Sequence, residues 1–494
     1  MLIFKIGNIE TDIIGYAEFP GFDSIYSSLR KKMSFRPDGY VFSPLFKKHK
    51  WDGWKRLIWK NSRRCYFPTG LFSIAKQFFK DNNIPYSISD NRKKPEENLF
   101  VNYNFSDFPI RDYQQRGIDS CVKKGRGILW FATGSGKTVV SGAIIEKCAV
   151  APFLFLVTSI DLLEQTAERL SEVLLKNGYP AKIGKIGGGK VDIQDITVMT
   201  VQTAVRVLGK KFQKYDNESK DDKTDLTLIQ EHKEEILNLM HNARGVVCDE
   251  VQHWRADICQ LVTNNLENAY FRFGLSATPW RDTGDDLLIQ SCFGKTICEV
   301  KASELIKKGY LVKPYIHFIH INPKPSKFKN WQNIYKEQIV ENVYYNTLIA
   351  NIAEEYISSN RLVLILVQQI EHGKLLEDTI EGCTFVNGAS PKNERISAIK
   401  RLKNRQIRCI CSTVIFDEGI DCKPLDTLIL AGGGKSPTRA IQRIGRTLRP
   451  YEGKNSSTVI DFYIHEKYLE EHAKAREKMY KTEEEFVIEH NFID

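Results

Sequence analysis

Short apolar runs alternate with amphipathic, helix-like segments over two long stretches of the chain. Between Phe108 and about Val300 the runs are GILWFA, FLFLVTS, ITVMTV, GVVCDE and FRFGLSA, and segments such as DLLEQTAERLSEVLLKN separate them. From Tyr315 to the end, LVLILVQ, FVNGA, IRCICST, DTLILAG and STVIDFY repeat the alternation. Strands that are apolar on both faces are typical of parallel sheets covered by helices. The pattern therefore predicts two α/β lobes.

The first 95 residues depart from this pattern because they are rich in aromatic and basic side chains. They end in the polar stretch NRKKPEEN, which is typical of a linker. A length of 494 residues, at roughly 150 residues per domain, indicates about three domains. We expect a small α+β domain at 1–95, an α/β lobe at 96–305 and a second α/β lobe at 306–494.

Two charged stretches interrupt the apolar pattern. Within 207–235, KKFQKYDNESKDDKTD has few apolar side chains to bury and predicts a polar surface insertion. Near the C-terminus, EKYLEEHAKAREKMYKTEEEF predicts a charge-laced helix with a solvated face. Neither stretch suggests chemistry.

The composition is that of a folded protein, with 42% hydrophobic and 27% charged residues. A formal net charge of +10 favours an acidic partner. Eleven cysteines without a CxxC pair argue against a disulfide framework and a zinc or iron–sulfur site, and they favour a reducing cytoplasm. Glu10 and Asp12 argue against a signal peptide, and the most apolar run, Ala149–Val157, is far shorter than the roughly 18 residues of a membrane span. We therefore expect no membrane partner.

The segment GILWFATGSGKTVVSGAII reads as a strand, a Gly-rich turn and a helix, which is the setting of a phosphate-binding loop. Backbone N–H groups of the turn Gly134–Ser135–Gly136 can approach phosphate oxygens, and the helix directs its positive end at them. Lys137 is expected to reach the β and γ phosphates and Thr138 to bind Mg²⁺. The first Gly of the strict pattern would fall at Phe131, so the loop departs from the general form there.

A second acidic element, ARGVVCDEVQHW, reads as a strand that ends in two carboxylates. Asp249 is expected to hold Mg²⁺ through water, and Glu250 to accept a proton from the attacking water. Either Gln252 or His253 could link these carboxylates to neighbouring motifs, and the sequence leaves that choice open.

From Arg111 to Arg449 the order of motifs resembles that of superfamily 2 helicases and translocases, whose motors are two tandem RecA-like domains. The resemblance implies that a Gln reads the adenine edge, that several loops touch the nucleic-acid backbone, and that a Ser-Ala-Thr motif links hydrolysis to movement. Thr158 stands where the family usually has Pro. The positions assigned in this way are Gln114 of RDYQQ for adenine, Ser159 of LVTSIDLLEQT, Gly188 of IGGG and Thr200 and Gln202 of TVQT for the nucleic-acid backbone, and Ser276 and Thr278 of LSATPWR for coupling.

In the second lobe, STVIFDEGID resembles a further family motif, which places Thr413 on the DNA backbone and Gly419 and Asp421 near the nucleotide.

The segment SPTRAIQRIGRTLRP predicts a helix that Ser436 caps and Pro437 begins. Gln442, Arg446 and Arg449 recur at spacings of four and three, so we expect them on one helix face. In the family this face closes on the ATP of the first lobe, with Gln442 at the site and Arg446 and Arg449 as arginine fingers.

In the N-terminal region, lysines and arginines alternate with tryptophans between Phe35 and Phe72. Bases supply phosphate contacts and aromatic rings can stack or wedge against nucleobases. A small Trp-cored domain with a basic rim is the alternative. The patterns DGYVFSP, WDG and FPTGL resemble the N-terminal region of UvsW-type phage helicases, which drive branch migration and fork regression. The expected DNA contacts are Lys47, Lys48, Lys50, Trp51, Trp54, Lys55 and Arg56.

The motifs together predict an ATP-dependent DNA helicase or translocase acting on branched DNA in recombination, repair or replication restart. Its cofactors would be ATP and Mg²⁺. Its partners would be branched or duplex-containing DNA, with recombination or replication proteins as candidates, and we expect a monomer in the cytoplasm, or the host cytoplasm if a phage encodes it. The alternatives are an RNA helicase, the motor subunit of a restriction system, and, from another class, a non-catalytic nucleic-acid scaffold.

Overall fold

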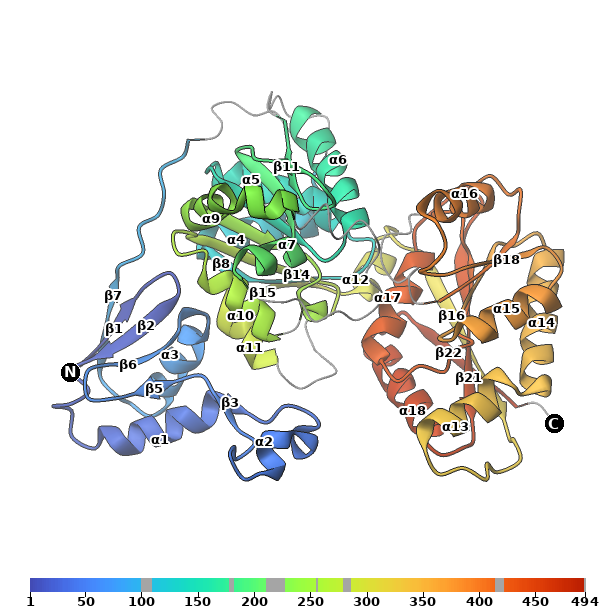
Figure 1. Ribbon diagram of the computed structural model, residues 1–494, viewed down its shortest axis with the longest axis horizontal. Helices are drawn as coiled ribbons and strands as arrows, with labels where there is room; N and C mark the ends of the chain where they lie inside the picture. The colour runs from blue at the N-terminus through green and yellow to red at the C-terminus, as the bar shows by residue number, and fades with distance from the viewer. Residues whose placement is uncertain are drawn as a thin grey trace. The chain divides into compact units, whose positions relative to one another are not determined.

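The computed structural model describes residues 1–98, 109–176, 182–209, 227–254, 256–278, 286–413 and 422–492. These residues form two compact units: Met1–Phe131 with Gly136–Glu299, and Ala132–Ser135 with Val300–Asp494 (Figure 1). No helix among the described residues has the length and apolar character needed to cross a membrane. Most of the predicted polar insertion, 210–226, lies outside the described residues. The predicted boundaries near residues 95 and 305 remain predictions.

The N-terminal module, residues 1–95, is a small α+β fold, as predicted. Its main sheet has the order β5-β6-β2-β1-β7, and a separate two-stranded sheet pairs β3 with β4. Alternation along LIFKI buries Leu2, Phe4 and Ile6 on one face of β1, as expected for a half-buried strand. The elements are β1 (Leu2–Ile6), β2 (Glu10–Ile14), α1 (Phe22–Lys32), β3 (Ser34–Phe35), η1 (Tyr40–Phe42), α2 (Pro44–Lys47), β4 (Lys55–Arg56), β5 (Trp59–Lys60), β6 (Cys65–Pro68), η2 (Thr69–Leu71), α3 (Phe72–Asp81) and β7 (Tyr86–Asp90).

The first α/β lobe contains a parallel sheet in the order β11-β10-β12-β9-β13-β14-β8-β15, with an antiparallel edge pair of β10 and β11. The five apolar runs expected in this lobe form β8, β9, β12, β13 and β14, which confirms them as strands. The elements are α4 (Asp112–Lys124), β8 (Arg126–Phe131), α5 (Lys137–Cys148), β9 (Phe153–Val157), α6 (Ile160–Lys176), β10 (Gly184–Ile186), β11 (Val191–Asp192), β12 (Ile196–Thr200), α7 (Val201–Val207), α9 (Lys233–Asn242), β13 (Gly245–Cys248), η4 (Val251–His253), α10 (Ala256–Asn264), β14 (Phe271–Ser276), α11 (Asp286–Phe293) and β15 (Thr296–Val300).

The N-terminal module and the first lobe share part of one hydrophobic core. Leu288 of α11 is buried within the cluster that also holds Phe4, Phe67 and Phe79 of the module. A Cβ atom on Gly70 of η2 would lie 2.2 Å from the carbonyl oxygen of Gln290, so only glycine permits this approach. The module is therefore packed onto the helix that follows Ser276–Thr278 in the chain.

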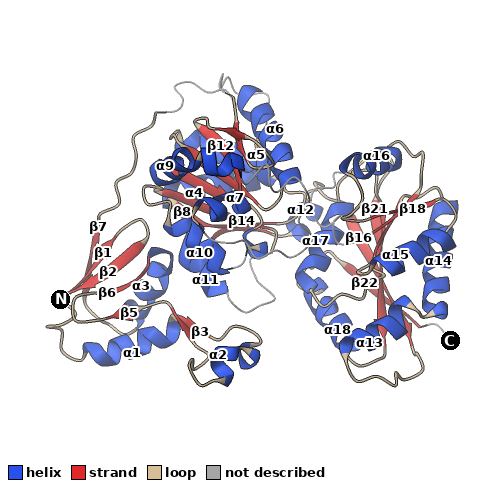
Figure 2. Cartoon of the chain, in the orientation of Figure 1, coloured by secondary structure: helices blue, strands red, loops and turns tan. Residues whose placement is uncertain are grey.

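The second α/β lobe has a sheet in the order β18-β19-β17-β20-β21-β16-β22, and its strands pair in parallel. Its five predicted apolar runs become β17, β18, β19, β20 and β21. Figure 2 shows α14 and α15 on one side of these strands and α17 and α18 on the other. The elements are α12 (Ala302–Lys307), β16 (Lys313–Ile321), α13 (Trp331–Tyr335), η5 (Lys336–Val340), α14 (Val343–Ser358), β17 (Val363–Leu366), α15 (Ile370–Thr379), β18 (Cys383–Val386), α16 (Lys392–Lys403), β19 (Cys409–Ser412), β20 (Thr427–Ile429), α17 (Pro437–Thr447), β21 (Ser456–Ile464), α18 (Leu469–Tyr480) and β22 (Val487–Phe492).

Helix α18 is more than the solvated charged helix that its sequence predicts. Arg476 is buried and donates two hydrogen bonds to the buried carboxylate of Asp461, at 2.9 and 2.7 Å. Its third donor group reaches the carbonyl oxygen of Gly434 at 2.7 Å, and Tyr480 also donates to Asp461. Because each polar atom of this buried pair has a partner, the desolvation cost is largely offset. The network ties α18 to the segment that leads into α17.

Candidate nucleotide site and nucleic-acid interface

The turn after β8 has the backbone of a phosphate-binding loop. Gly134 and Gly136 adopt φ values of 86° and 82°, which other residues rarely adopt. Gly136 is the N-cap of α5, and Lys137 and Thr138 are the first two residues of that helix. The N–H groups of the first turn therefore point toward the space where an anion would bind.

The two catalytic candidates of the first lobe are in direct contact. The Lys137 ammonium donates to the Glu250 carboxylate at 2.6 Å, although the two residues are far apart in sequence. Glu250 has a φ of 47°, a left-handed conformation that costs roughly 1–2 kcal/mol for a non-glycine residue. Strain of this kind is commonly stored at functional sites. The structure thus brings together the phosphate loop and the second acidic element.

A chain of hydrogen bonds continues from Glu250 to the Ser-Ala-Thr motif. The Gln252 side chain donates to Glu250, and its carbonyl oxygen accepts from the Ser276 hydroxyl. The same hydroxyl contacts the carbonyl of Thr278 and accepts from the Thr278 N–H at 3.1 Å. Gln252, one of the two candidates for this link, therefore contacts both Glu250 and Ser276. The side chain of the other candidate, His253, lies outside the described residues.

Asp249 and Thr138 are suited to a Mg²⁺ ion that keeps water and phosphate ligands. Asp249 follows β13 directly, is partly exposed, and accepts a hydrogen bond from the Glu250 N–H at 2.9 Å. The described residues contain no group of three or more His, Cys, Asp or Glu side chains that could hold a metal. One carboxylate and one hydroxyl fit Mg²⁺, which usually takes few protein ligands and several waters or phosphates.

Gln114 lies beside the phosphate loop. It is buried in the first turn of α4, and its Nε2 atom is 2.7 Å from the position of a Cβ on Gly136. Its Oε1 accepts from the Arg111 N–H at 3.0 Å and so completes a helix cap. The location fits the expected nucleotide contact, and adenine reading remains a proposal.

The loops assigned to the nucleic-acid backbone gather at the carboxyl ends of β9, β10 and β12. Ser159 caps α6, where its hydroxyl accepts from the Leu162 N–H. The Gln202 amide donates to the carbonyl of Thr158. A Cβ on Gly188 would lie 2.9 Å from Ile160, and Thr200 is buried as the N-cap of α7. The three predicted loops thus lie together at the carboxyl ends of neighbouring strands of the first sheet.

In the second lobe, Ser436 caps α17 and Pro437 begins it, as predicted. Gln442 and Arg446 lie one turn apart on this helix. The helix ends at Thr447, so the expectation that Arg449 shares its face is wrong. Pro450 explains the early end, because a proline disfavours helical backbone at the residue before it.

Two further predicted positions of the second lobe can only be placed in part. Thr413 is buried directly after β19. Gly419 and Asp421 lie outside the described residues.

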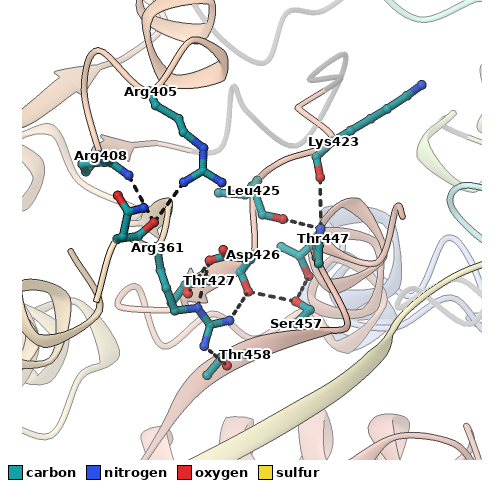
Figure 3. A network of polar contacts seen from close by, with 12 residues as sticks. Arg361, Arg405, Arg408, Lys423, Leu425, Asp426, Thr427, Thr447, Ser457 and Thr458 are labelled. Carbon is teal, nitrogen blue, oxygen red and sulfur yellow. Dashed lines mark hydrogen bonds and ion pairs between the residues drawn. The ribbon is translucent and has the colours of Figure 1, made fainter. Parts of the chain in front are cut away.

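A polar network fixes the end of α17 and the segment that carries Arg449 (Figure 3). The Lys454 ammonium donates to the carbonyls of Lys423, Leu425 and Arg449. Burial lowers the pKa of Lys454 to about 8. The remaining contacts are Ser457 to Thr447 at 2.6 Å, Arg361 to the Asp426 carboxylate at 3.2 Å and to Thr458 at 3.0 Å, and Arg405 and Arg408 to the carbonyl of Asn360.

The N-terminal module is not built around its tryptophans, so the alternative of a Trp-cored domain is wrong. Its core consists of phenylalanines and aliphatic residues, and Trp54 and Trp59 are 37% and 40% exposed. The Trp51 ring is only partly buried, and its Nε1 donates to the carbonyl of Trp54 at 2.8 Å. Of the five basic residues predicted to contact DNA, four are exposed, whereas Arg56 is half-buried and pairs with Asp52; the four are Lys47, Lys48, Lys50 and Lys55.

Three family models match successive parts of the chain. The N-terminal domain of DNA helicase UvsW matches residues 12–89, the res subunit of type III restriction enzymes matches 107–281, and the helicase conserved C-terminal domain matches 345–451. The three matches follow the same order as the module and the two lobes.

Similar proteins support the same assignment. The protein named helicase 22 of Sulfolobus islandicus filamentous virus is 28% identical over 85% of this chain and 74% of its own length. The ATP-dependent DNA helicase uvsW of Enterobacteria phage T4 is 25% identical over 93% of this chain and 94% of its own. A solved fragment assigned as the HsdR subunit of a type I restriction enzyme from Vibrio vulnificus has the same fold, with a TM-score of 0.56 at 17% identity, and covers 85% of this chain and 74% of that one. The chain therefore belongs to the superfamily 2 helicases and has a UvsW-like domain order.

Proposed function

We propose that this chain is an ATP-driven DNA helicase or translocase that acts on branched DNA. The observation that carries the proposal is the polar chain from Lys137 through Glu250 and Gln252 to Ser276 and Thr278. Side chains connect the phosphate-binding lysine to Ser276, outside the phosphate loop, and the Ser276 hydroxyl contacts the backbone of Thr278. A change at the phosphates can therefore be transmitted to a distant part of the same lobe.

Lys137 and Glu250 would act in sequence during hydrolysis. A γ-phosphate that binds the Lys137 ammonium competes with Glu250 for the same hydrogen bond. Glu250 can then accept a proton from the attacking water, held in place by Gln252. The reaction breaks the bond between the β and γ phosphates, and water supplies the new oxygen of inorganic phosphate.

Thr138 and Asp249 would hold a Mg²⁺ ion at the phosphates. The ion would neutralise phosphate charge when bound. Asp249 is kept in place by the hydrogen bond from the Glu250 N–H, so the acid that binds the metal and the acid that takes the proton are oriented together.

Gln442, Arg446 and Arg449 of the second lobe would complete the site, with the two arginines stabilising charge on the γ-phosphate. The networks under α17 and Arg449 support this role because they fix the backbone from which these side chains extend. Gly419 and Asp421 remain candidate nucleotide contacts.

DNA would run along the edge formed by Ser159, Gly188 and Gln202 of the first lobe. Thr200 of the first lobe and Thr413 of the second lobe remain candidate contacts to the DNA backbone. The N-terminal module would hold the branched substrate through its exposed lysines. A monomer in the cytoplasm, working beside recombination or replication proteins, is the arrangement that we propose for the cell.

The proposal is tested by measuring ATP hydrolysis with single-stranded DNA, duplex DNA, a four-way junction and RNA side by side. We expect the strongest stimulation with the junction and none above background with RNA. Glu250→Gln serves as the control for contaminating ATPases. Equal or stronger stimulation by RNA would contradict the proposal.

A motor subunit of a restriction system is the second candidate, because the first lobe matches the res subunit of type III restriction enzymes. The match to the UvsW N-terminal domain at residues 12–89 favours branch processing instead. Incubating the chain with ATP and long unmodified duplex DNA distinguishes the two functions, since only a restriction motor is expected to support cleavage once a nuclease partner is added.

A further inference from the structure

Residues 36–56 form a subdomain of the N-terminal module with its own small packing centre. The Arg36 guanidinium lies between two rings, 4.9 Å from the centre of Tyr40 and 4.8 Å from that of Trp54. Tyr40 packs edge-on against Phe46 at 4.9 Å. These rings do not belong to the main core of the module. In Figure 1, α2 and β3 are set apart from the five-stranded sheet.

The turns of this subdomain are held by backbone hydrogen bonds throughout. The Phe42 N–H donates to Gly39, the Lys47 N–H to Ser43 and the Lys50 N–H to Leu45, at 2.9, 3.0 and 2.9 Å. Pro44 begins α2, where its fixed φ suits a helix start. Tyr40 also packs directly on Gly53, where a Cβ would lie 2.6 Å from its ring. The subdomain is therefore a fixed platform rather than an unstructured loop.

This platform displays three large apolar side chains to solvent. Val41 is 41% exposed, Phe42 74% and Leu45 55%, and all three come from the consecutive turns η1 and α2. Single exposed apolar residues are common on protein surfaces, but a group of them on one rigid turn usually marks an interaction site. Trp51 and Trp54 are less exposed and have contacts within the platform, since Trp51 Nε1 donates to the Trp54 carbonyl and Arg36 lies over the Trp54 ring.

The positive charge around these three side chains favours a polyanion as the partner. Between residues 36 and 60 the sequence holds seven lysines and arginines against two aspartates. Lys47, Lys48 and Lys50 are exposed, and no ion pair joins them to a carboxylate among the described residues. The Lys47 ammonium lies 5.9 Å from the Phe42 ring. Exposed apolar side chains with a lysine beside one of them, and further exposed lysines close in sequence, suit nucleobases flanked by phosphates. The helix α2, with four residues, is too short for an interfacial membrane helix.

We infer that Val41, Phe42 and Leu45 form a wedge that inserts between bases where DNA strands branch, while the neighbouring lysines hold the flanking phosphates. Apolar side chains of this kind can unstack base steps when phosphate contacts supply the binding energy. A branch point favours such insertion, because its bases are already less fully stacked. The inference rests on the proposed function and names the contact by which the module would recognise a branch.

The test compares the double variant Phe42→Ala/Leu45→Ala with wild type in the full-length chain. Binding to a four-way junction is measured without ATP, and a 2-aminopurine at the branch point reports unstacking by increased fluorescence. We expect junction affinity to fall by roughly 5- to 100-fold, the range associated with losing one stacked base. The fluorescence increase should disappear, and affinity for linear duplex should change less than about twofold.

The matched control is Ile14→Ala/Ile88→Ala, which removes two apolar side chains, each 45% exposed, from the same module. Both double variants should remain folded, because each deleted side chain is about half exposed or more. Their melting temperatures are measured alongside to check this. Phe42→Trp should retain junction binding, since it keeps an aromatic face.

Three results would overturn the inference. Unchanged junction affinity and fluorescence would exclude insertion of these side chains between bases. An equal loss of affinity for the junction and for linear duplex would make Phe42 and Leu45 general DNA contacts. Phe42-dependent binding to phosphatidylserine vesicles would assign these side chains to membranes. Because these readouts need no ATP, they stay separate from a failure of the proposed motor activity, which would appear as wild-type ATPase that DNA does not stimulate.

Discussion

The two α/β lobes share an architecture but carry opposite chemistry. In the first lobe, polar side chains contact one another in a chain from Lys137 to Ser276, which ends at the Thr278 backbone. The Glu250 carboxylate lies within this chain, and the Glu250 N–H donates to the carboxylate of Asp249. In the second lobe, the candidates on and after α17 are two arginines and a glutamine, and the hydrogen bonds around them fix the backbone. Among the described residues, the candidate carboxylates for metal binding and proton transfer lie in the first lobe, whereas the candidate arginines of the second lobe would supply positive charge.

The lobes also differ in their buried histidines. His320 and His372 are buried in the second lobe, whereas no described histidine side chain of the first lobe is buried. Both rings have a lowered pKa, because burial disfavours the charged form. A falling pH is therefore expected to lower the stability of the second lobe before that of the first.

Removing the candidate arginine fingers of the second lobe should have the largest effect on the rate of ATP hydrolysis. Arg446→Ala or Arg449→Ala should reduce kcat by about 10³-fold or more while ATP affinity changes little, since a finger acts on charge in the transition state. Lys454→Met, which removes the hydrogen bond to the Arg449 carbonyl, should give a smaller loss. The control is Arg443→Ala, which removes a partly exposed arginine of α17 that follows Gln442 directly and therefore lies off the face shared by Gln442 and Arg446. A loss confined to ATP affinity would mean that these arginines only bind the nucleotide.

Removing the proposed proton acceptor of the first lobe should have the next largest effect on the rate of ATP hydrolysis. Glu250→Gln is expected to lower kcat by roughly 10²- to 10⁴-fold and to leave ATP binding intact. Lys137→Ala should lower both, because it removes charge that the phosphates use in the ground state as well. Glu234→Gln, an exposed carboxylate of the same lobe, is the control. Turnover near wild type in Glu250→Gln would exclude it as the base.

Acid should loosen the second lobe before the first. His372 donates from Nε2 to Asn346 at 2.8 Å, its Nδ1 has no partner among the described residues, and burial lowers its pKa to about 4. Because the folded pKa lies below the ordinary value of 6.5, its contribution is complete above pH 6.5 and is lost as pH falls toward 4. The loss amounts to about 3 kcal/mol.

Hydrogen exchange of the full chain between pH 7 and pH 4.5, corrected for intrinsic rates, measures this difference. Peptides from α14 and α15 should lose protection while those from α5 and α6 keep it. His372→Gln should remove most of the pH dependence. Equal loss in both lobes would contradict the assignment to buried histidines.

Breaking the polar chain at its middle should have the smallest effect on basal activity. Gln252→Met keeps the side-chain length but removes the hydrogen bonds to Glu250 and Ser276. Hydrogen bonds to charged groups contribute about 1.5–3 kcal/mol, so DNA-stimulated hydrolysis should fall by roughly 10- to 100-fold, and basal hydrolysis by less. A uniform fall in both rates would assign Gln252 to the chemistry alone.

Local sequence patterns predicted the elements well because their signals are local. All ten apolar runs are strands, and Ser436 and Pro437 begin α17 as expected. Pro450 is also a local signal for the end of that helix, although the spacing of the arginines predicts a helix that reaches Arg449. The polar chain could not be predicted, because Gln252 and Ser276 meet only when β13 and β14 pair.

Contacts between distant segments account for the other differences. The charged C-terminal helix buries Arg476 because Asp461 lies on the strand before it. The core of the N-terminal module includes Leu288, so deletion of residues 1–95 would expose that side chain and disturb α11. Variants such as Phe42→Ala are therefore a cleaner probe of the module than its removal.

The central claim is that hydrolysis drives movement along DNA, and displacement of a third strand from a DNA triplex measures that movement directly. We predict that wild type displaces the third strand with ATP but not with a non-hydrolysable analogue, and that Glu250→Gln binds the same DNA without displacing it. Displacement by Glu250→Gln, or by wild type with the analogue, would contradict the account.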